Sequence, residues 1–301
     1  MLQKTIRKSC DSLELFLSKK PIAAHTQKAF DQVSGLIDHG RPIVLDSGCG
    51  TARSTLLLAD KFPNHTIVGV DRSFVRLVRN ANSRGDTPMN MEDEQQQETT
   101  TDDGDIDDNN NDASLRPYYQ QVGPNAVIVR AELMDFWRLV LQANNKDKCW
   151  NIEHHYLLYP NPYPTKARLK QRFYAHSSFP LLLQVGGEIT IRSNWKGYLQ
   201  EFAQSVLIAN DYYHDKSTQQ GQQQQHDDDV TEGDHPHLMT TKNVNVARPY
   251  VSSARHGPQE RTDKTVAWTN FERKYDTVGE PTYELRLTRR EPSNDDDESD
   301  S

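Results

Sequence analysis

Cysteine is scarce in this chain, which holds only three in 301 residues. Cys10, Cys49 and Cys149 lie far apart, so their spacing matches neither a disulfide framework nor a zinc motif. A chain without a disulfide framework is typical of a reducing compartment. We therefore expect an intracellular protein, located in the cytoplasm or the nucleus.

Long apolar runs are also missing. No stretch approaches the roughly 20 apolar residues of a membrane span, and no apolar core of a secretory signal follows the charged start at residues 1–8. We therefore expect a protein that is not secreted and has no membrane partner. Apolar residues make up only 35% of the chain, so we expect part of it to stay outside any packed core.

Basic residues are absent from two acidic segments and almost absent from a third. Residues 86–112 and 291–301 contain no Lys or Arg, and residues 211–235 contain one. The three segments together carry −23 while the whole chain carries −8, so the other 238 residues carry +15. A basic body of this kind suits a polyanionic partner such as a nucleic acid.

Short apolar runs alternate with helical patterns along the chain. The runs predict strands at 42–46, 66–71, 125–130, 152–159, 188–192 and 282–287. Helical patterns lie at 54–59, 136–141 and 195–209. This alternation predicts an α/β fold with a mainly parallel sheet. Ligands bind beyond the carboxyl ends of such strands, and acids or amides follow several of them, which indicates an enzyme.

We divide the chain into three parts. Residues 1–40 form a helical segment, residues 41–290 form one α/β domain, and residues 291–301 form an acidic disordered tail. Insertions at about 84–116 and 211–262 are rich in Asp, Glu, Gln and Asn. Such segments cannot bury enough apolar surface to offset the entropy of ordering, so we predict that both are disordered.

A glycine-rich turn follows the first predicted strand. Gly48 and Gly50 allow a ligand to approach the backbone, but Arg53 stands where a dinucleotide fingerprint has its third glycine. The acid before the turn, Asp46, suits a cofactor with a cationic amino-acid end. We interpret Cys49 as a small buried residue rather than a nucleophile.

Asp71 ends the second predicted strand. A carboxylate at this point can accept both hydroxyls of a ribose, and it can also cap the helix that starts at Arg72 and Ser73. We favour the ribose interpretation because of the upstream glycine turn. Glu132, after the third strand, is equally consistent with adenine binding and with no role.

The most specific segment runs from Tyr159 to Arg172. A Pro-Asn-Pro turn holds Asn161 at a strand end, with the aromatic ring of Tyr163 beside it. Four cations follow within seven residues, at Lys166, Arg168, Lys170 and Arg172. Stacking rings and clustered cations are typical of binding to single-stranded or looped nucleic acid, and the basic body favours RNA.

These motifs resemble the tRNA (guanine-N7-)-methyltransferases of the TrmB type. Two further motifs add to the resemblance: Arg192-Ser193-Asn194-Trp195 is similar to the family's T-D-W, and Thr269-Asn270-Phe271-Glu272 to its T-x-F-E. The match covers roughly 42–82, 125–209 and 265–289. It implies the class I S-adenosylmethionine-dependent methyltransferase fold, a Rossmann-like sheet that is mainly parallel with an antiparallel last strand.

The resemblance also implies roles for individual residues. S-adenosyl-L-methionine would contact Asp46, Gly48 and Gly50 through its methionine end, Asp71 and Arg72 through its ribose, and Glu132 through its adenine. Asn161 stands at the place of the catalytic aspartate. The tRNA partner would contact two groups, the strand-end and motif residues Asn194, Thr269 and Glu272, and the basic block Tyr163, Thr165, Lys166, Arg168, Lys170 and Arg172.

The chain departs from the family at three positions. Asn161 and Asn194 replace two acids, and Thr165 stands where the family has a lysine, with Lys166 one residue later. Guanine N7 already carries a lone pair, so positioning without deprotonation is enough for methyl transfer to it. The leading hypothesis is a tRNA methyltransferase forming N7-methylguanosine. The alternatives are a non-catalytic tRNA-binding relative and a methyltransferase acting on another RNA.

His154 and His155 are adjacent in a predicted strand and have no third ligand nearby in the sequence. We interpret them as core or surface histidines and expect no metal site.

Overall fold

The computed structural model describes residues 1–38, 40–81, 119–145, 150–224, 250–252 and 257–289. The predicted insertion at 84–116 and the acidic tail at 291–301 lie outside the described residues. None of the helices in the described ranges has the length and apolar character needed to cross a membrane.

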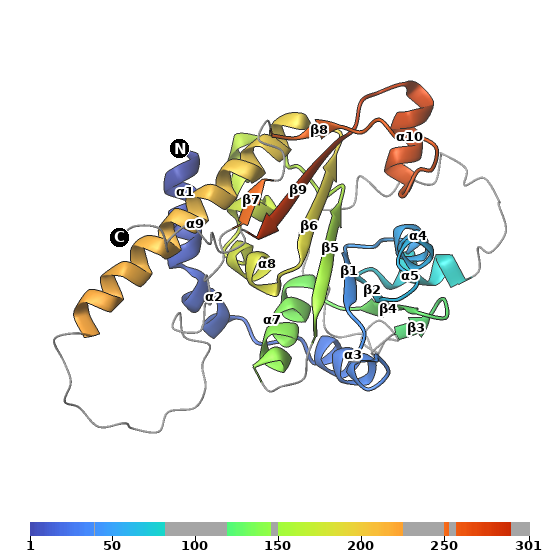
Figure 1. The fold of residues 1–301 in the computed structure, drawn as a ribbon, viewed down its shortest axis with the longest axis horizontal. Helices are drawn as coiled ribbons and strands as arrows, with labels where there is room; N and C mark the ends of the chain where they lie inside the picture. The colour runs from blue at the N-terminus through green and yellow to red at the C-terminus, as the bar shows by residue number, and fades with distance from the viewer. Residues whose placement is uncertain (39, 82–118, 146–149, 225–249, 253–256, 290–301) are drawn as a thin grey trace, which may run out of the picture.

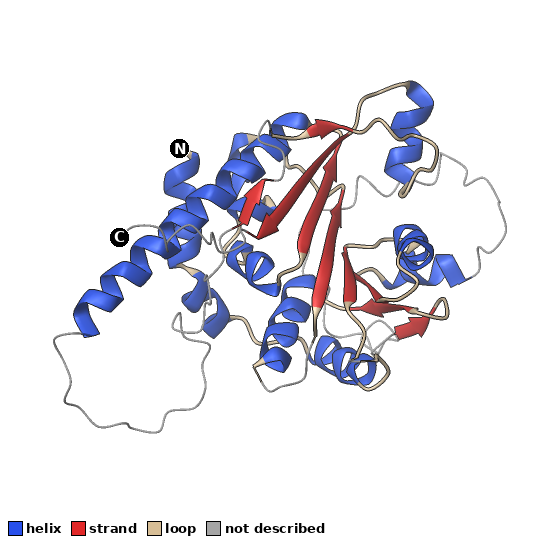
Figure 2. Cartoon of the chain, in the orientation of Figure 1, coloured by secondary structure: helices blue, strands red, loops and turns tan. Residues whose placement is uncertain are grey.

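The described chain alternates helices and strands (Figures 1 and 2). The α-helices are α1 (Leu2–Asp11), α2 (Leu13–Lys19), α3 (Ala24–Ser34), α4 (Arg53–Lys61), α5 (Phe74–Ala81), α7 (Leu133–Asn144), α8 (Phe179–Val185), α9 (Lys196–Gln224) and α10 (Asn270–Val278). Two 3-10 helices are η2 (Lys166–Gln171) and η3 (Phe173–Ala175). The strands are β1 (Ile43–Ser47), β2 (Thr66–Asp71), β3 (Tyr119–Gln121), β4 (Ala126–Arg130), β5 (Ile152–Leu158), β6 (Glu188–Ser193), β7 (Tyr250–Ser252), β8 (Gln259–Glu260) and β9 (Tyr283–Arg289).

All the strands join one sheet in the order β3-β4-β2-β1-β5-β6-β9-β7, and β8 pairs with β9. The five central strands, β4 to β6, run parallel. The last strand, β9, runs antiparallel to β6. The predicted α/β fold, with a mainly parallel sheet and an antiparallel last strand, is therefore confirmed.

The central strands are apolar on both faces because helices cover both sides of the sheet. Val68 and Val70 of β2 belong to the larger core, which the helices α1, α3, α7, α8 and α9 close. Ile67 lies on the other face in a smaller core with Leu58 of α4. This explains why the sequence shows continuous apolar runs rather than clean alternation at these strands.

Helix α9 corrects one prediction. The sequence places the start of a disordered insertion at residue 211, but α9 continues to Gln224. Tyr212 and Tyr213 are buried, and the hydroxyl of Tyr212 donates to Asp11 on α1. Packing against α1 supplies the apolar burial that the polar composition conceals. Near the other end of the predicted insertion, β8 joins the sheet and Arg261 is buried.

Candidate functional site

The carboxyl edge of the parallel strands contains a topological switch point. From β1 the chain passes to β2 and β4 on one side, and then returns to place β5 on the other side of β1. Crossover helices on opposite sides leave room for a ligand at such a point. The turn after β1 and the turn after β5 both border it, so the two most specific sequence motifs lie at one place in the fold.

The glycine turn after β1 contains three residues in the left-handed region of the backbone. Gly48 and Gly50 have φ values of 79° and 58°, and Ala52, the residue before α4, has a φ of 59°. A Cβ added at either glycine would meet no atom within 4 Å. The turn therefore borders open space, and glycine suits the backbone angles that the turn requires. Cys49 between them is buried, and burial holds the pKa of its thiol well above the ordinary value.

Asp46 is buried at the end of β1 and is only half satisfied. Its Oδ2 accepts hydrogen bonds from the hydroxyls of Ser54 and Thr55, both at 2.7 Å. Its Oδ1 is buried and has no partner in the described part of the chain. Burial raises the pKa of Asp46 to about 6, although the two hydroxyl bonds oppose this. A free oxygen on a buried acid is a ready acceptor for a cationic group.

Asp71 connects the glycine turn to the start of α5. Its Oδ2 accepts from the amide of Gly50 at 3.0 Å, and its Oδ1 accepts from the amide of Ser73 at 2.8 Å. The contact with Ser73 fits the interpretation as a helix cap, and the ribose interpretation stays a prediction. Arg76 Nη2 also lies 3.9 Å from Oδ1. Arg72 is exposed, and its carbonyl accepts from Arg130 Nε at 3.4 Å.

Glu132 is the residue before α7 and is half-buried. Its backbone amide donates to the hydroxyl of Thr26 on α3, at 3.0 Å. The residue follows β4, which pairs in parallel with β2, so it lies at the same edge of the sheet as Asp71. The position is compatible with contact to a planar base.

The Pro-Asn-Pro turn after β5 is held in an unusual backbone conformation. Tyr159 and Tyr163 have φ values of 53° and 41°, a region that non-glycine residues rarely adopt. Asn161 is exposed, and its Oδ1 accepts from the amide of Tyr163 at 3.2 Å. Backbone strain of this kind clusters at functional sites, where surrounding contacts maintain it.

Arg172 supplies those contacts and departs from its expected role. The side chain is buried, and its Nε donates to the carbonyl of Tyr163 at 3.1 Å. Its Nη1 pairs with Glu201 of α9 and with the hydroxyl of Tyr174, both at 2.6 Å. The guanidinium also lies 5.0 Å from the ring of Trp195. Arg172 thus braces the turn from behind and is not placed to contact an RNA phosphate.

The other residues of the basic block are exposed. Lys166, Arg168 and Lys170 lie in the 3-10 helix η2, which buries none of its residues, and Thr165 precedes it. None of these three cations pairs with a carboxylate within the described ranges. Free cations beside Asn161 and Tyr163 form a surface suited to phosphate groups.

Thr269 and Glu272 differ from what the resemblance implies. Glu272 is fully buried, and its Oε1 accepts from Arg192 at 2.9 Å. Its Oε2 accepts from the amide of Trp268 at 2.6 Å, and its own amide donates to the hydroxyl of Thr269 at 3.1 Å. This is a helix-capping arrangement at the start of α10 combined with a buried ion pair. With both oxygens engaged, Glu272 has no exposed atom for a guanine.

Asn194 is exposed directly after β6. Because β6 is parallel to β5, Asn194 and Asn161 lie at the same edge of the sheet. Sequence reasoning missed Phe271, whose exposed ring is stacked near that of Tyr159 with centroids 6.1 Å apart. An aromatic residue inside the T-x-F-E motif was the available signal.

The fold and this site together define an α/β protein whose candidate site lies at the switch point of a mainly parallel sheet. No protein-family model matches the chain, and no curated protein matches it. Among solved structures, the chain is similar to a 16S rRNA (adenine(1408)-N(1))-methyltransferase from Catenulisporales acidiphilia, with 14% identity over 88% of this chain and 92% of that one and a TM-score of 0.39.

Two further structures show the same level of likeness. The 16S rRNA methyltransferase KamB has 12% identity over 87% of this chain and 93% of its own, with a TM-score of 0.40. The aminoglycoside resistance methyltransferase NpmB1 has 14% identity over 87% and 93%, with a TM-score of 0.38. These values support no comparison residue by residue. The resemblance to the tRNA (guanine-N7-)-methyltransferases stays a hypothesis.

Proposed function

We propose that this protein is an S-adenosyl-L-methionine-dependent RNA methyltransferase, with guanine N7 of a tRNA as the target. One observation carries the proposal. A half-satisfied buried acid, an open glycine turn and a second carboxylate stand together at the switch point of a parallel sheet. That combination offers a cation acceptor, room for backbone approach and acceptors for sugar hydroxyls within one site.

In this proposal the cofactor lies along the carboxyl ends of β1, β2 and β4. The free Oδ1 of Asp46 accepts from the ammonium of the methionine end, and Gly48 and Gly50 allow that end to approach. Asp71 receives the ribose hydroxyls, while Arg72 and Glu132 border the ribose and adenine. The carboxylates of Asp46 and Asp71 suit this cofactor, because its methionine end carries an ammonium and its sulfonium is also positive.

The chemical step is a direct displacement. The guanine N7 lone pair forms a bond to the methyl carbon as the bond from that carbon to sulfur breaks, and the neutral thioether S-adenosylhomocysteine leaves. No base is needed at N7. The amide of Tyr163 holds Asn161 Oδ1, so Asn161 Nδ2 is left to donate to guanine O6 and orient the ring.

The RNA side of the proposal rests on the surface beyond Asn161. The ring of Tyr163 offers a stacking face, and Thr165, Lys166, Arg168 and Lys170 meet the backbone phosphates. Asn194, at the end of β6, is positioned to contact the same nucleotide. Arg172, Thr269 and Glu272 act instead as positioning residues for the surrounding loops.

Cofactor binding is the first test. Calorimetric titration of S-adenosylhomocysteine into the purified full chain is expected to show one site, lost in Asp71→Asn and kept in the exposed control Asp60→Asn. Absence of binding to the unaltered protein would refute the proposal at its base.

The substrate is tested separately, with labelled cofactor and either bulk tRNA or bulk rRNA, followed by nucleoside mass spectrometry. N7-methylguanosine in the tRNA supports the full proposal. A methylated nucleoside in rRNA alone would support the methyltransferase activity and would reject tRNA as the target. Binding of cofactor and tRNA without product indicates the non-catalytic relative.

A further inference from the structure

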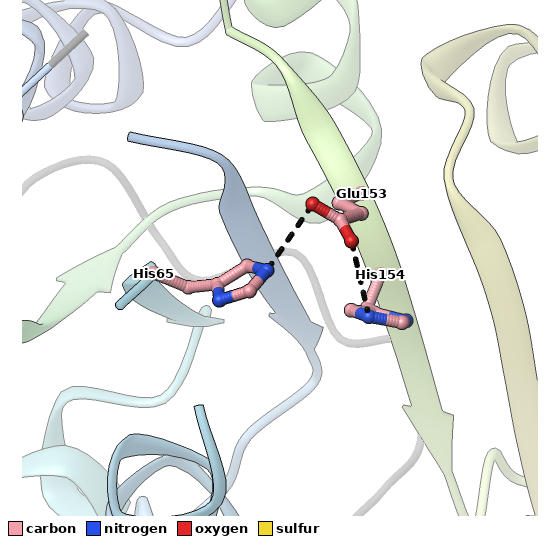
Figure 3. A group of neighbouring side chains, drawn as sticks. All are labelled: His65, Glu153 and His154. Atoms are coloured by element: carbon pink, nitrogen blue, oxygen red, sulfur yellow. Dashed lines mark hydrogen bonds and ion pairs between the residues drawn. The ribbon is translucent and has the colours of Figure 1, made fainter. Parts of the chain in front are cut away.

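A second group of polar side chains lies at the amino ends of β2 and β5, opposite the edge that holds the candidate site. His65 precedes β2, and Glu153 and His154 lie near the start of β5 (Figure 3). His65 Nε2 is 3.2 Å from Glu153 Oε2, and His154 Nε2 is 3.8 Å from Glu153 Oε1. One ligand atom from each residue lies within 4.8 Å of the others.

We propose that His65, Glu153 and His154 bind a divalent transition-metal ion, with zinc as the best fit. Two imidazoles and a carboxylate are a known zinc-ligand set that leaves a fourth position for water. Ligand atoms around tetrahedral zinc stand about 3.4 Å apart, so small side-chain rotations must draw these atoms together. We expected no metal because the sequence shows no third ligand near His154. The fold supplies one in His65, which lies in a turn 88 residues before Glu153.

The surroundings hold the two imidazoles in place. The ring of Phe62 packs against both, with centroids 5.2 Å from His65 and 4.7 Å from His154. His65 Nδ1 is buried and has no hydrogen-bond partner among the described residues. The Nε2 atom of each ring is the one that faces Glu153, so the packing directs both imidazoles toward the same carboxylate.

Local charge also favours a cation. Glu188 lies opposite His154 in the register of β5 and β6, so it adds a second carboxylate near Glu153. Lys61 is an opposing charge that acts on His154, and its Nζ lies 5.1 Å from the centre of the Phe62 ring. Two carboxylates against one ammonium leave the cluster net negative when the imidazoles are neutral, the form that binds metal.

The test is a competition titration of Zn²⁺ between the full chain and a chromophoric chelator. Glu153→Gln removes the ligand charge at a half-exposed position, and His154→Gln removes an imidazole. We expect each to weaken zinc binding by more than about tenfold. The control is His214→Gln, an exposed histidine on α9, which should bind zinc as the unaltered protein does.

A second measurement separates this site from others in the chain. The sequence has three histidines, His226, His235 and His237, in an acidic stretch outside the described residues. A background with all three changed to Gln should still bind one Zn²⁺, and Co²⁺ in its place should show an absorption band of tetrahedral intensity. Equal zinc affinity in Glu153→Gln and the unaltered chain, or loss of binding in that background, would overturn the proposal.

Discussion

Asp46 and Asn161 divide the proposed chemistry between a buried acid and an exposed amide. Asp46 is enclosed, and its raised pKa means that its charge is costly until a cation arrives. Asn161 carries no charge and acts by geometry alone. The cofactor site therefore depends on pH through one residue, while the orienting residue of the substrate site does not titrate.

The first prediction concerns the pH dependence of cofactor binding. Asp46 titrates at about 6, and its ionised form is the one that accepts an ammonium. We expect the affinity for S-adenosylhomocysteine to fall by about tenfold as pH is lowered from about 7.5 to about 5, measured by calorimetry. In Asp46→Asn the affinity should be low at both values and its pH dependence should flatten.

The stability of the folded protein should change with pH in the opposite direction to cofactor affinity. The pKa of Asp46 is raised above its ordinary value of 3.8, so its contribution is fully present below that value and is lost as pH rises through about 6. In denaturant titrations, the free energy of unfolding of the unaltered chain should fall over this range more than that of Asp46→Asn. Parallel profiles for the two proteins would mean that the carboxyl is not buried as described.

Helix α10 is anchored by a buried cluster of charges. Arg192 pairs with Glu272 and with Glu284 of β9, and its guanidinium lies 4.2 Å from the ring centre of Trp268. The cluster joins the start of α10 to the edge of the parallel sheet. It therefore fixes the surface that carries Phe271 beside Tyr159.

The second prediction tests that anchor. Glu272→Gln leaves Arg192 with a single carboxylate partner in a buried place, so we expect a loss of about 3 kcal/mol in the free energy of unfolding. Chemical denaturation measures it, with the exposed Glu280→Gln on the same segment as the matched control. A change no larger than that of Glu280→Gln would show that the ion pair contributes little.

The third prediction concerns the brace behind the Pro-Asn-Pro turn. Lysine has one ammonium in place of the fork of Arg172, so Arg172→Lys cannot reach Tyr163, Tyr174 and Glu201 together. We expect methyl transfer to drop by about tenfold or more while cofactor affinity stays unchanged, because the turn lies on β5 and not on β1 or β2.

The control for the brace is Lys170→Arg, which keeps a cation on the exposed neighbouring helix η2. Methylation assays and calorimetry on both variants separate the two effects. If cofactor affinity fell together with the rate in Arg172→Lys, the role of Arg172 would be general stability rather than positioning of the turn.

The strands of the central sheet could be predicted because strands that are buried on both faces appear in the sequence as short apolar runs. Strands such as 66–71 and 188–192 were located within a residue of their observed ends. The continuation of α9 was not predictable, because its polar residues conceal two tyrosines that pack on a distant helix. Helix α8 was missed too, since six of its seven residues are apolar and buried, and such a run shows no helical period.

The candidate site divides in the same way. Motif spacing placed Asp46, Gly48, Gly50, Asp71 and Asn161 at one edge of the sheet, and the strand order agrees. The sequence alone does not distinguish Arg172, which points inward, from the solvent-facing cations of the same block. The burial of Arg172 depends on its ion pair with Glu201, which comes from a different element, α9. For the same reason a buried Glu272 looked like a substrate contact.

At the scale of the molecule, charge is segregated along the chain. Residues 86–112, which lie between α5 and β3 in the chain, hold 11 acids and no base. The cations of η2 lie at the candidate site. The surface proposed for RNA is therefore locally basic although the whole chain has a net charge of −8.

The fourth prediction follows from that segregation. Replacing Lys166, Arg168 and Lys170 by Gln should weaken tRNA binding and lower the slope of log affinity against log salt by up to about 3. The matched control changes Lys4, Lys19 and Lys28, which are exposed on α1, α2 and α3, to Gln. Equal slopes of log affinity against log salt in the two triple variants would show that the RNA does not bind at η2.

The fifth prediction concerns the acidic segment. Replacing residues 86–112 with a short Gly-Ser linker should leave cofactor affinity unchanged and raise tRNA affinity at low salt, where long-range repulsion is least screened. Filter binding and calorimetry measure the two quantities. A collapse of cofactor binding would show that the segment supports the fold.

The pairing of α1 with α9 has a consequence for synthesis. Arg7 contacts Asp215, which is 208 residues further along the chain. At ribosomal speeds the apolar face of α1, with Ile6 and Cys10, stays uncovered for roughly 10–40 s until α9 has been synthesised. During that interval the nascent chain exposes an aggregation-prone amphipathic helix. We therefore expect the yield of folded protein in cells to depend on chaperones that bind such helices early in synthesis.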